Sequence, residues 1–189
     1  MTLAHGAGAG MNHEFMVKIS KSLAENDIAT LRFNFPFMEK QKRRPDSPAV
    51  AHKAIEAAID KAHELFPSLP VFASGKSFGG RMSSQYLAMQ PAANVKGIIF
   101  FGFPLHQSGK PSIERAEHLK NVVVPLLFLQ GTRDELASYD LMEKVCASLP
   151  LATLIRIEGA NHAFKAGKQD LMPILTDATR SWIDQRIKS

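Results

Sequence analysis

Apolar residues follow two alternating patterns along this chain. Short runs rich in β-branched and aromatic residues are separated by longer stretches in which apolar residues recur every three or four positions. This alternation is typical of a parallel β-sheet covered by helices. The predicted strands are Thr2–His5, Ile28–Phe35, Pro70–Ser74, Val95–Phe101, Val122–Gln130 and Ala152–Glu158.

Helical spacing fills the intervals between these strands. It is carried by Phe15, Ile19 and Leu23, by Ala51, Ile55, Ala58, Ala62 and Leu65, by Met82, Tyr86 and Met89, and by Leu171, Leu175, Ala178 and Trp182. The run Val122–Leu129 is apolar at nearly every position, which predicts a central strand covered on both faces. The most loop-like stretches are Pro36–Pro48 and Gly102–Pro111. Because no repeat or linker interrupts the pattern, we expect residues 1–189 to form one α/β domain.

Composition narrows the class of protein. The 189 residues are 45% hydrophobic and 22% charged, which is ordinary for a globular protein. The net charge of +5 permits anionic partners, but arginine-rich tracts typical of nucleic-acid binders are missing. The single cysteine, Cys146, excludes an internal disulfide and a multi-thiolate zinc site, and its helical surroundings predict an inert core residue. No apolar run approaches a membrane span, and Met1–His5 does not resemble a signal peptide, so we expect a cytoplasmic protein with no membrane or nucleic-acid partner.

One loop carries a recognisable chemical motif. Right-handed crossovers place every strand-to-helix loop at the carboxyl edge of a parallel sheet, where ligands bind. There, Gly75-Lys76-Ser77-Phe78-Gly79 forms a G-x-S-x-G directly after a predicted strand and directly before a predicted helix. This arrangement is a nucleophile elbow, in which the strained turn exposes the serine hydroxyl and larger residues at the glycines would collide with strand and helix. A plain helix N-cap is the alternative role of Ser77.

Competing motifs fail on spacing. A Walker A loop ending in Gly75-Lys76-Ser77 needs glycine where Pro70 stands, and a dinucleotide fingerprint starting at Gly6 needs glycine where Met11 stands. The zinc motif begun by His13 lacks its second histidine, because Val17 occupies that position. We therefore expect no cofactor and no metal.

A serine nucleophile needs a histidine base and a carboxylate that orients it. In hydrolases of this topology the chain order is serine, acid, histidine. Of seven histidines, only His162 follows the candidate acids and lies in the loop after the last strand. Asp134 is the preferred acid, while Glu135 and Glu158 compete with it. The two N–H donors for an oxyanion are predicted at Phe78, directly after the serine, and at Ala7, which we favour over Gly8.

These motifs resemble the α/β-hydrolase family over essentially the whole chain: His5-Gly6, Gly75-x-Ser77-x-Gly79, Asp134 and His162 match in order. The resemblance implies a compact, mostly parallel six-stranded sheet in the order 2-1-3-4-5-6, helices on both faces and no large cap domain. The segments His5–Gly10 and Arg32–Phe37 look like the dienelactone-hydrolase-like subgroup that includes testis-expressed and chromatin-complex relatives. Dienelactone hydrolases proper use cysteine where Ser77 stands, and the family usually has strands before the one ending at His5, so the resemblance suggests a domain without those N-terminal strands.

The resulting expectation is a serine hydrolase that cleaves small carboxylic esters or thioesters through an acyl-enzyme. The alternative is a non-catalytic interaction module with the same fold. The residues expected to line a shallow substrate site are Met11, Phe37, Phe103, Leu105 and Phe164. The basic run Lys40–Arg44 is either a solvated loop or a rim that attracts anionic substrates, and His5 is expected to order its loop. An open edge at Ile28–Phe35 predicts self-association, most simply as a twofold homodimer joined edge to edge or through the adjacent helix faces. The alternative is a monomer whose edge is covered by the Pro36–Pro48 loop.

Overall fold

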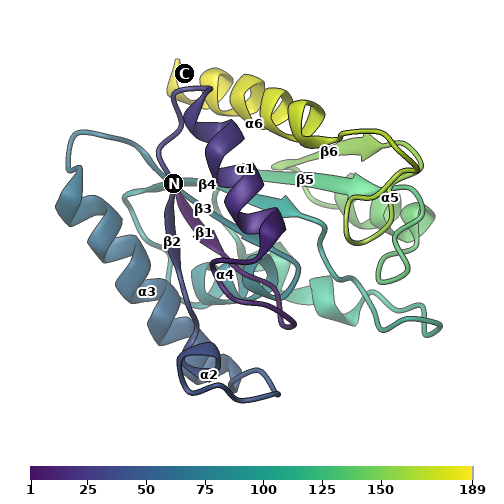
Figure 1. Ribbon diagram of the computed structural model, residues 1–189, viewed down its shortest axis with the longest axis horizontal. Coiled ribbons are helices and arrows are strands. Elements are labelled where there is room, and N and C mark those ends of the chain that lie inside the picture. The colour runs from purple at the N-terminus through teal and green to yellow at the C-terminus, as the bar shows by residue number, and fades with distance from the viewer. Residues whose placement is uncertain (189) are drawn as a thin grey trace.

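Six parallel strands form a single sheet in the order β2-β1-β3-β4-β5-β6, which confirms the predicted topology (Figure 1). The computed structural model describes residues 1–188. The strands are β1 (Thr2–Ala4), β2 (Leu31–Phe33), β3 (Val71–Lys76), β4 (Val95–Phe101), β5 (Leu126–Gly131) and β6 (Ala152–Ile157). All are joined through helices or loops that return the chain to the same end of the sheet, so the carboxyl ends of the strands share one edge.

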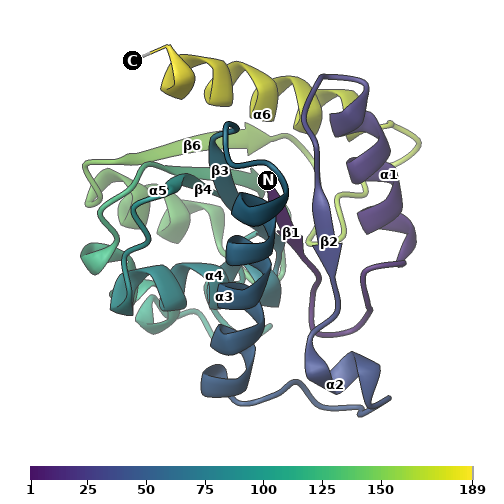
Figure 2. The same ribbon diagram turned by 90° about the vertical axis from the view of Figure 1, so that its left-hand side faces the viewer.

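Helices cover both faces of this sheet (Figure 2). One face is covered by α1 (Glu14–Ala24) and α6 (Met172–Ile187), which lie side by side. The other face is covered by α3 (Pro48–Leu65), α4 (Phe78–Met89), the 3-10 helix η1 (Glu114–Asn121) and α5 (Tyr139–Ala147). A short helix, α2 (Pro36–Glu39), follows β2. The α/β architecture is therefore that of the compact α/β-hydrolase fold implied by the sequence.

The central strands are buried on both sides because successive residues alternate between two apolar layers. In β4, Ile98 and Phe100 face the α3–α4 layer, whereas Ile99 and Phe101 face the α1–α6 layer. β5 repeats this alternation, and every one of its residues is buried. This explains why its sequence is apolar without a period of two. The two layers hold β3, β4 and β5 rigidly beneath the carboxyl-edge loops.

Two predicted strands are shorter in the structure by several residues. β2 has three residues rather than the eight of Ile28–Phe35, because the chain turns away at Phe35 to begin α2 at Pro36. β5 begins at Leu126 rather than at Val122, which caps the end of η1, and Pro125 before the strand has no N–H to donate. Val123 is accordingly 66% exposed, so the predicted covering of Val122–Leu129 on both faces is wrong at Val123, although Val122 is buried.

The connection from β4 to β5 contains only loops and η1, so in the described part of the chain no cap domain is inserted there. Among residues 1–188, no helix is both long and apolar enough to cross a membrane. Within the same range, no group of three or more His, Cys, Asp and Glu side chains is arranged to hold a metal ion.

Candidate active site

Ser77 occupies a strained turn between β3, which ends at Lys76, and α4, which begins at Phe78. Its backbone has φ 51° and ψ −114°. A non-glycine residue in such a region costs about 1–3 kcal/mol, and this cost persists only where surrounding structure enforces it. Part of that enforcement is the Ser77 N–H, which donates to the Phe101 carbonyl of β4 at 3.3 Å. The turn therefore projects the serine from the carboxyl edge of the sheet.

The glycines of the motif are sterically required. A Cβ added to Gly75 would lie 2.3 Å from the backbone nitrogen of Gly80 in α4. A Cβ added to Gly79 would lie 2.5 Å from the Ala4 carbonyl oxygen of β1. Both distances are shorter than any real contact, and both obstacles are backbone. The spacing in the sequence thus reflects the close approach of α4 to β1 and β3.

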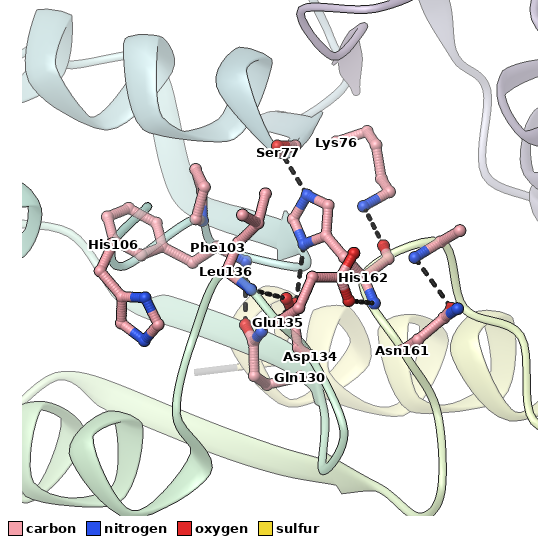
Figure 3. Close-up of polar contacts among 12 residues, drawn as sticks. Lys76, Ser77, Phe103, His106, Gln130, Asp134, Glu135, Leu136, Asn161 and His162 are labelled. Carbon is pink, nitrogen blue, oxygen red and sulfur yellow. Dashed lines mark hydrogen bonds and ion pairs between the residues drawn. The ribbon is translucent and has the colours of Figure 1, made fainter. Parts of the chain in front are cut away.

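Ser77, His162 and Asp134 form a continuous chain of hydrogen bonds (Figure 3). Ser77 Oγ lies 2.8 Å from His162 Nε2, and His162 Nδ1 lies 2.8 Å from Asp134 Oδ2. Because a carboxylate only accepts, Nδ1 carries the proton that binds Asp134, which leaves Nε2 to accept from the serine hydroxyl. The Asp134 side chain is 1% exposed and that of His162 is 14% exposed. The imidazole can thus take a proton from Ser77 while a buried carboxylate holds its other nitrogen.

Asp134 is itself held by three N–H donors. Besides His162, its carboxylate accepts from Gln130 Nε2 at 2.6 Å and from the Leu136 backbone N–H at 2.8 Å. Gln130 is fully buried, and its Oε1 accepts the Phe103 N–H at 2.9 Å. Gln130 therefore ties the carboxylate to the loop after β4. Sequence reasoning missed this residue, although a glutamine at the end of an otherwise apolar strand was a visible signal.

The two competing acids are engaged elsewhere. Glu158 forms an exposed ion pair with Arg156 at 2.7 Å. Glu135 accepts the backbone N–H of His162 at 3.2 Å rather than meeting its ring. Of the three acids weighed from the sequence, the structure brings Asp134 alone to the imidazole.

Lys76 is the second residue that sequence reasoning missed. Its Nζ donates to the His162 carbonyl at 2.6 Å, as Figure 3 shows. The ammonium lies 5.1 Å from the ring centre of Phe164 and 5.9 Å from that of Phe15. Burial lowers the pKa of Lys76 to about 8, while Asp134 and Glu135 act in the opposite direction. A lysine inside the elbow motif was the signal available in the sequence.

His5 orders the loop after β1. Its Nδ1 lies 2.7 Å from the Gly6 carbonyl and its Nε2 accepts the Phe35 N–H at 3.0 Å, so Nδ1 carries the proton. Burial lowers the pKa of this fully enclosed ring, and the bond to Gly6 opposes that shift. The loop lies against the elbow, since a Cβ added to Gly6 would lie 3.7 Å from Ser77 Cβ.

A cavity of about 440 Å³ opens beside Ser77. Its lining comes from the loop after β1, the start of α1, the elbow and two carboxyl-edge loops: Gly6, Ala7, Gly8, Ala9, His13, Phe15, Met16, Lys76, Ser77, Leu136, His162 and Ala163. Ser77, His162 and the predicted donor residue Ala7 therefore share one cavity. Another cavity, of about 300 Å³, lies away from these residues between β2 and the ends of α3 and α6.

None of the five predicted substrate-contacting residues lines the cavity beside Ser77, so that prediction needs correction. Phe37, Phe103 and Leu105 are fully buried and pack in the core beneath α3 and α4. Phe164 is 6% exposed and stacks on Phe15, with ring centres 5.7 Å apart. Met11 bonds through its backbone to Arg32 and Asn34 on the β2 side. Their loops were placed at the correct edge, but their side chains turn inward or away.

A family model described as an alpha/beta hydrolase domain matches residues 1–183. Among solved structures, Est1E from Butyrivibrio proteoclasticus with bound ferulic acid is similar, with a TM-score of 0.80, 17% identity, and coverage of 100% of this chain and 89% of that one. Dienelactone hydrolase from Anabaena variabilis gives a TM-score of 0.76 at 19% identity, covering 98% of this chain and 85% of its own. A serine hydrolase without lid from Xanthomonas campestris gives a TM-score of 0.74 at 21% identity, covering 96% of this chain and 81% of its own.

Proposed function

Since the chain belongs to the alpha/beta hydrolase domain family, whose model matches residues 1–183, we propose that it is a serine hydrolase. Its substrates are small carboxylic esters or thioesters, and the reaction passes through an acyl-enzyme. The observation that carries this proposal is the unbroken hydrogen-bond chain from Ser77 through His162 to Asp134 at the wall of an open cavity. A non-catalytic interaction module with this fold would have no need of a strained serine facing such a cavity.

In the proposed reaction, Ser77 Oγ attacks the substrate carbonyl carbon while His162 Nε2 takes its proton. Asp134 stabilises the resulting imidazolium through Nδ1. The tetrahedral intermediate collapses when His162 returns the proton to the leaving alkoxide or thiolate, leaving Ser77 acylated. Water then repeats the sequence, with His162 as base, and releases the acid.

The negative oxygen of each tetrahedral intermediate needs preorganised donors. The first N–H groups of α4, beginning with Phe78, have no acceptor within the helix and lie next to Ser77. Ala7 is the proposed second donor. His5 holds the Gly6 carbonyl, and in a planar trans peptide the N–H of the next residue points the opposite way. The Ala7 N–H is thereby directed away from buried His5, and Ala7 lines the cavity.

Three finer parts of the proposal rest on the sequence. The single cysteine favours a cytoplasmic location. The segments His5–Gly10 and Arg32–Phe37 favour the subgroup with testis-expressed and chromatin-complex relatives. The exposed run Lys40–Arg44 lies outside the cavity lining, so any preference for anionic substrates acts over distance and should weaken with ionic strength.

Substitution of Ser77 tests the mechanism. We expect Ser77→Ala to reduce hydrolysis of a p-nitrophenyl acylate by about 1,000-fold or more, and His162→Ala nearly as much, because these groups act as a unit. Ser138→Ala is a suitable control, since this serine precedes α5 without a side-chain capping bond. Unchanged turnover of purified Ser77→Ala would eliminate the mechanism and favour an interaction module.

A further inference from the structure

His162 is held at four polar atoms, and only two of them belong to the proposed proton transfer. Its ring nitrogens meet Ser77 and Asp134. Its backbone N–H donates to the Glu135 carboxylate at 3.2 Å, and its backbone carbonyl accepts from the Lys76 ammonium at 2.6 Å. Two oppositely charged side chains thus bracket the residue whose ring must reach Ser77.

The loop that carries His162 needs such support. Phe164, two residues later, has φ 55°, a left-handed conformation unusual for an aromatic residue. Within the loop, the Asn161 side-chain oxygen accepts the N–H groups of Ala163 and Lys165, and the Asn161 backbone also bonds to the backbones of Phe164 and Lys165. These contacts shape the turn but leave both backbone groups of His162 to other partners.

Lys76 and Glu135 belong to the same segments of the chain as the other residues of the site. Lys76 is the last residue of β3 and directly precedes Ser77, while Glu135 directly follows Asp134. A bond from each to the His162 backbone therefore relates the histidine to its serine partner on one side and to its acid partner on the other. In residues 1–188, no carboxylate lies within ion-pair distance of the Lys76 ammonium, so its direct polar contact is to His162.

We propose that Lys76 and Glu135 are positioning residues, which hold the backbone carbonyl and the backbone N–H of His162 so that its imidazole stays between Ser77 Oγ and Asp134. This inference rests on the proposed function. Neither side chain takes part in proton transfer, because Lys76 Nζ bonds to a carbonyl and the Glu135 carboxylate bonds to a peptide N–H. Their effect on rate is geometric: misplacing a reacting group by about 1 Å costs on the order of 100-fold.

Lys76→Met separates positioning from general stability. Methionine retains most of the aliphatic stem beside Phe15 and Phe164 but removes the ammonium. We expect kcat for a neutral p-nitrophenyl ester to fall by about 10- to 100-fold with little change in KM, because His162 is displaced while the cavity persists. The melting temperature should stay the same or rise, since a buried ammonium costs free energy. A purely structural role would lower the melting temperature together with kcat.

Glu135→Ala provides a second test, because this side chain is exposed and its removal leaves the core intact. We expect kcat to fall less than in Lys76→Met. Glu135→Gln, which keeps an acceptor oxygen, should restore kcat. The double variant Glu135→Ala with Lys76→Met should show a non-additive effect on kcat. Lys165→Met removes an exposed ammonium from the same loop and serves as the matched control, with kcat unchanged.

An unchanged kcat in both Lys76→Met and Glu135→Ala would overturn the inference. A rise in KM at constant kcat would also overturn it, because Lys76 would then contact substrate. Either result leaves the proposed function standing if the unmodified protein still hydrolyses the ester and loses activity on Ser77→Ala. Loss of the proposed function would instead appear as inactivity of the unmodified protein.

Discussion

Gln130 shows how one buried side chain connects stability to the site. Its amide donates to Asp134 and accepts from the Phe103 N–H, and it is fully buried. We expect Gln130→Leu to lower the free energy of unfolding by about 1–3 kcal/mol, because the Phe103 N–H is left without an acceptor. Turnover should fall as well, since Asp134 loses one of its donors. Urea unfolding with parallel ester assays measures both, with exposed Gln90→Leu as the control, and unchanged stability would contradict the assigned role.

The sequence predicted that Ser77, Asp134 and His162 would meet for two reasons. The glycine spacing around Ser77 encodes close backbone approach, and the chain order places Asp134 and His162 in loops at the same edge of the sheet. It could not predict which way loop side chains turn. Phe37 and Phe103 enter the core, whereas Lys76, a charged residue, lines the cavity. The direction in which a loop side chain points depends on the neighbouring helices and strands, and no periodic pattern in the sequence indicates it.

At the scale of elements, the packing of η1 on α4 places a histidine where it cannot easily be protonated. His118 Nε2 lies 2.8 Å from Ser84 Oγ. Burial, aided by the charges of Arg81 and His52, lowers the pKa of His118 from 6.5 to about 4, while the Arg115 carbonyl opposes this shift. The folded protein therefore resists a proton that the unfolded chain accepts, so His118 costs stability progressively as the pH falls from about 6.5 towards 4.

We accordingly expect His118→Gln to reduce the loss of stability on acidification. The side-chain amide of glutamine retains a partner for Ser84 but does not titrate. The difference in the free energy of unfolding between the variant and the wild type should grow by about 1–2 kcal/mol between pH 7 and pH 4. This range allows for screening by the solvent. Urea unfolding over this range measures it, with exposed His63→Gln as the control. An equal acid dependence in His118→Gln and wild type would show that His118 is not responsible.

Element types were predictable here, whereas several boundaries were not. β4 was expected at Val95–Phe101 and is found there, because both of its faces are buried. β2 was predicted too long, since the apolar run Ile28–Phe35 serves three purposes: packing under α1, pairing with β1 and entry into α2. The pattern of apolar residues indicates which residues are buried, and buried residues continue past the last hydrogen bond between β2 and β1.

At the scale of the whole molecule, the short β4–β5 connection bears on substrate size. In the described residues it holds η1 and loops but no cap, and the cavity beside Ser77 is about 440 Å³. We expect kcat/KM to be higher for acyl groups of two to four carbons than for one of twelve, because a long chain would remain largely in water. A series of p-nitrophenyl esters measures this preference. A higher value for the twelve-carbon ester would contradict it.

Self-association was predicted through the open sheet edge or through the adjacent helix faces, and we expect the second of these surfaces. β2 offers only three residues, and short edge strands pair poorly. Beside it, the cavity of about 300 Å³ is flanked by Leu65, Phe66 and Leu69, each more than half exposed. We expect a twofold dimer through this face, weakened by Phe66→Lys more than by Phe33→Lys. Light scattering decides: a mass near 20.8 kDa at micromolar concentration would contradict the dimer.

The proposed function requires Ser77 to be an activated nucleophile held by His162. Intact-mass measurement of the protein treated with a fluorophosphonate, followed by peptide mapping, tests this most directly, because such reagents label serines whose proton a neighbouring base removes. We expect a single stoichiometric adduct on Ser77, lost in Ser77→Ala and strongly slowed in His162→Ala. The absence of an adduct on the folded protein, or its presence on another residue, would contradict it.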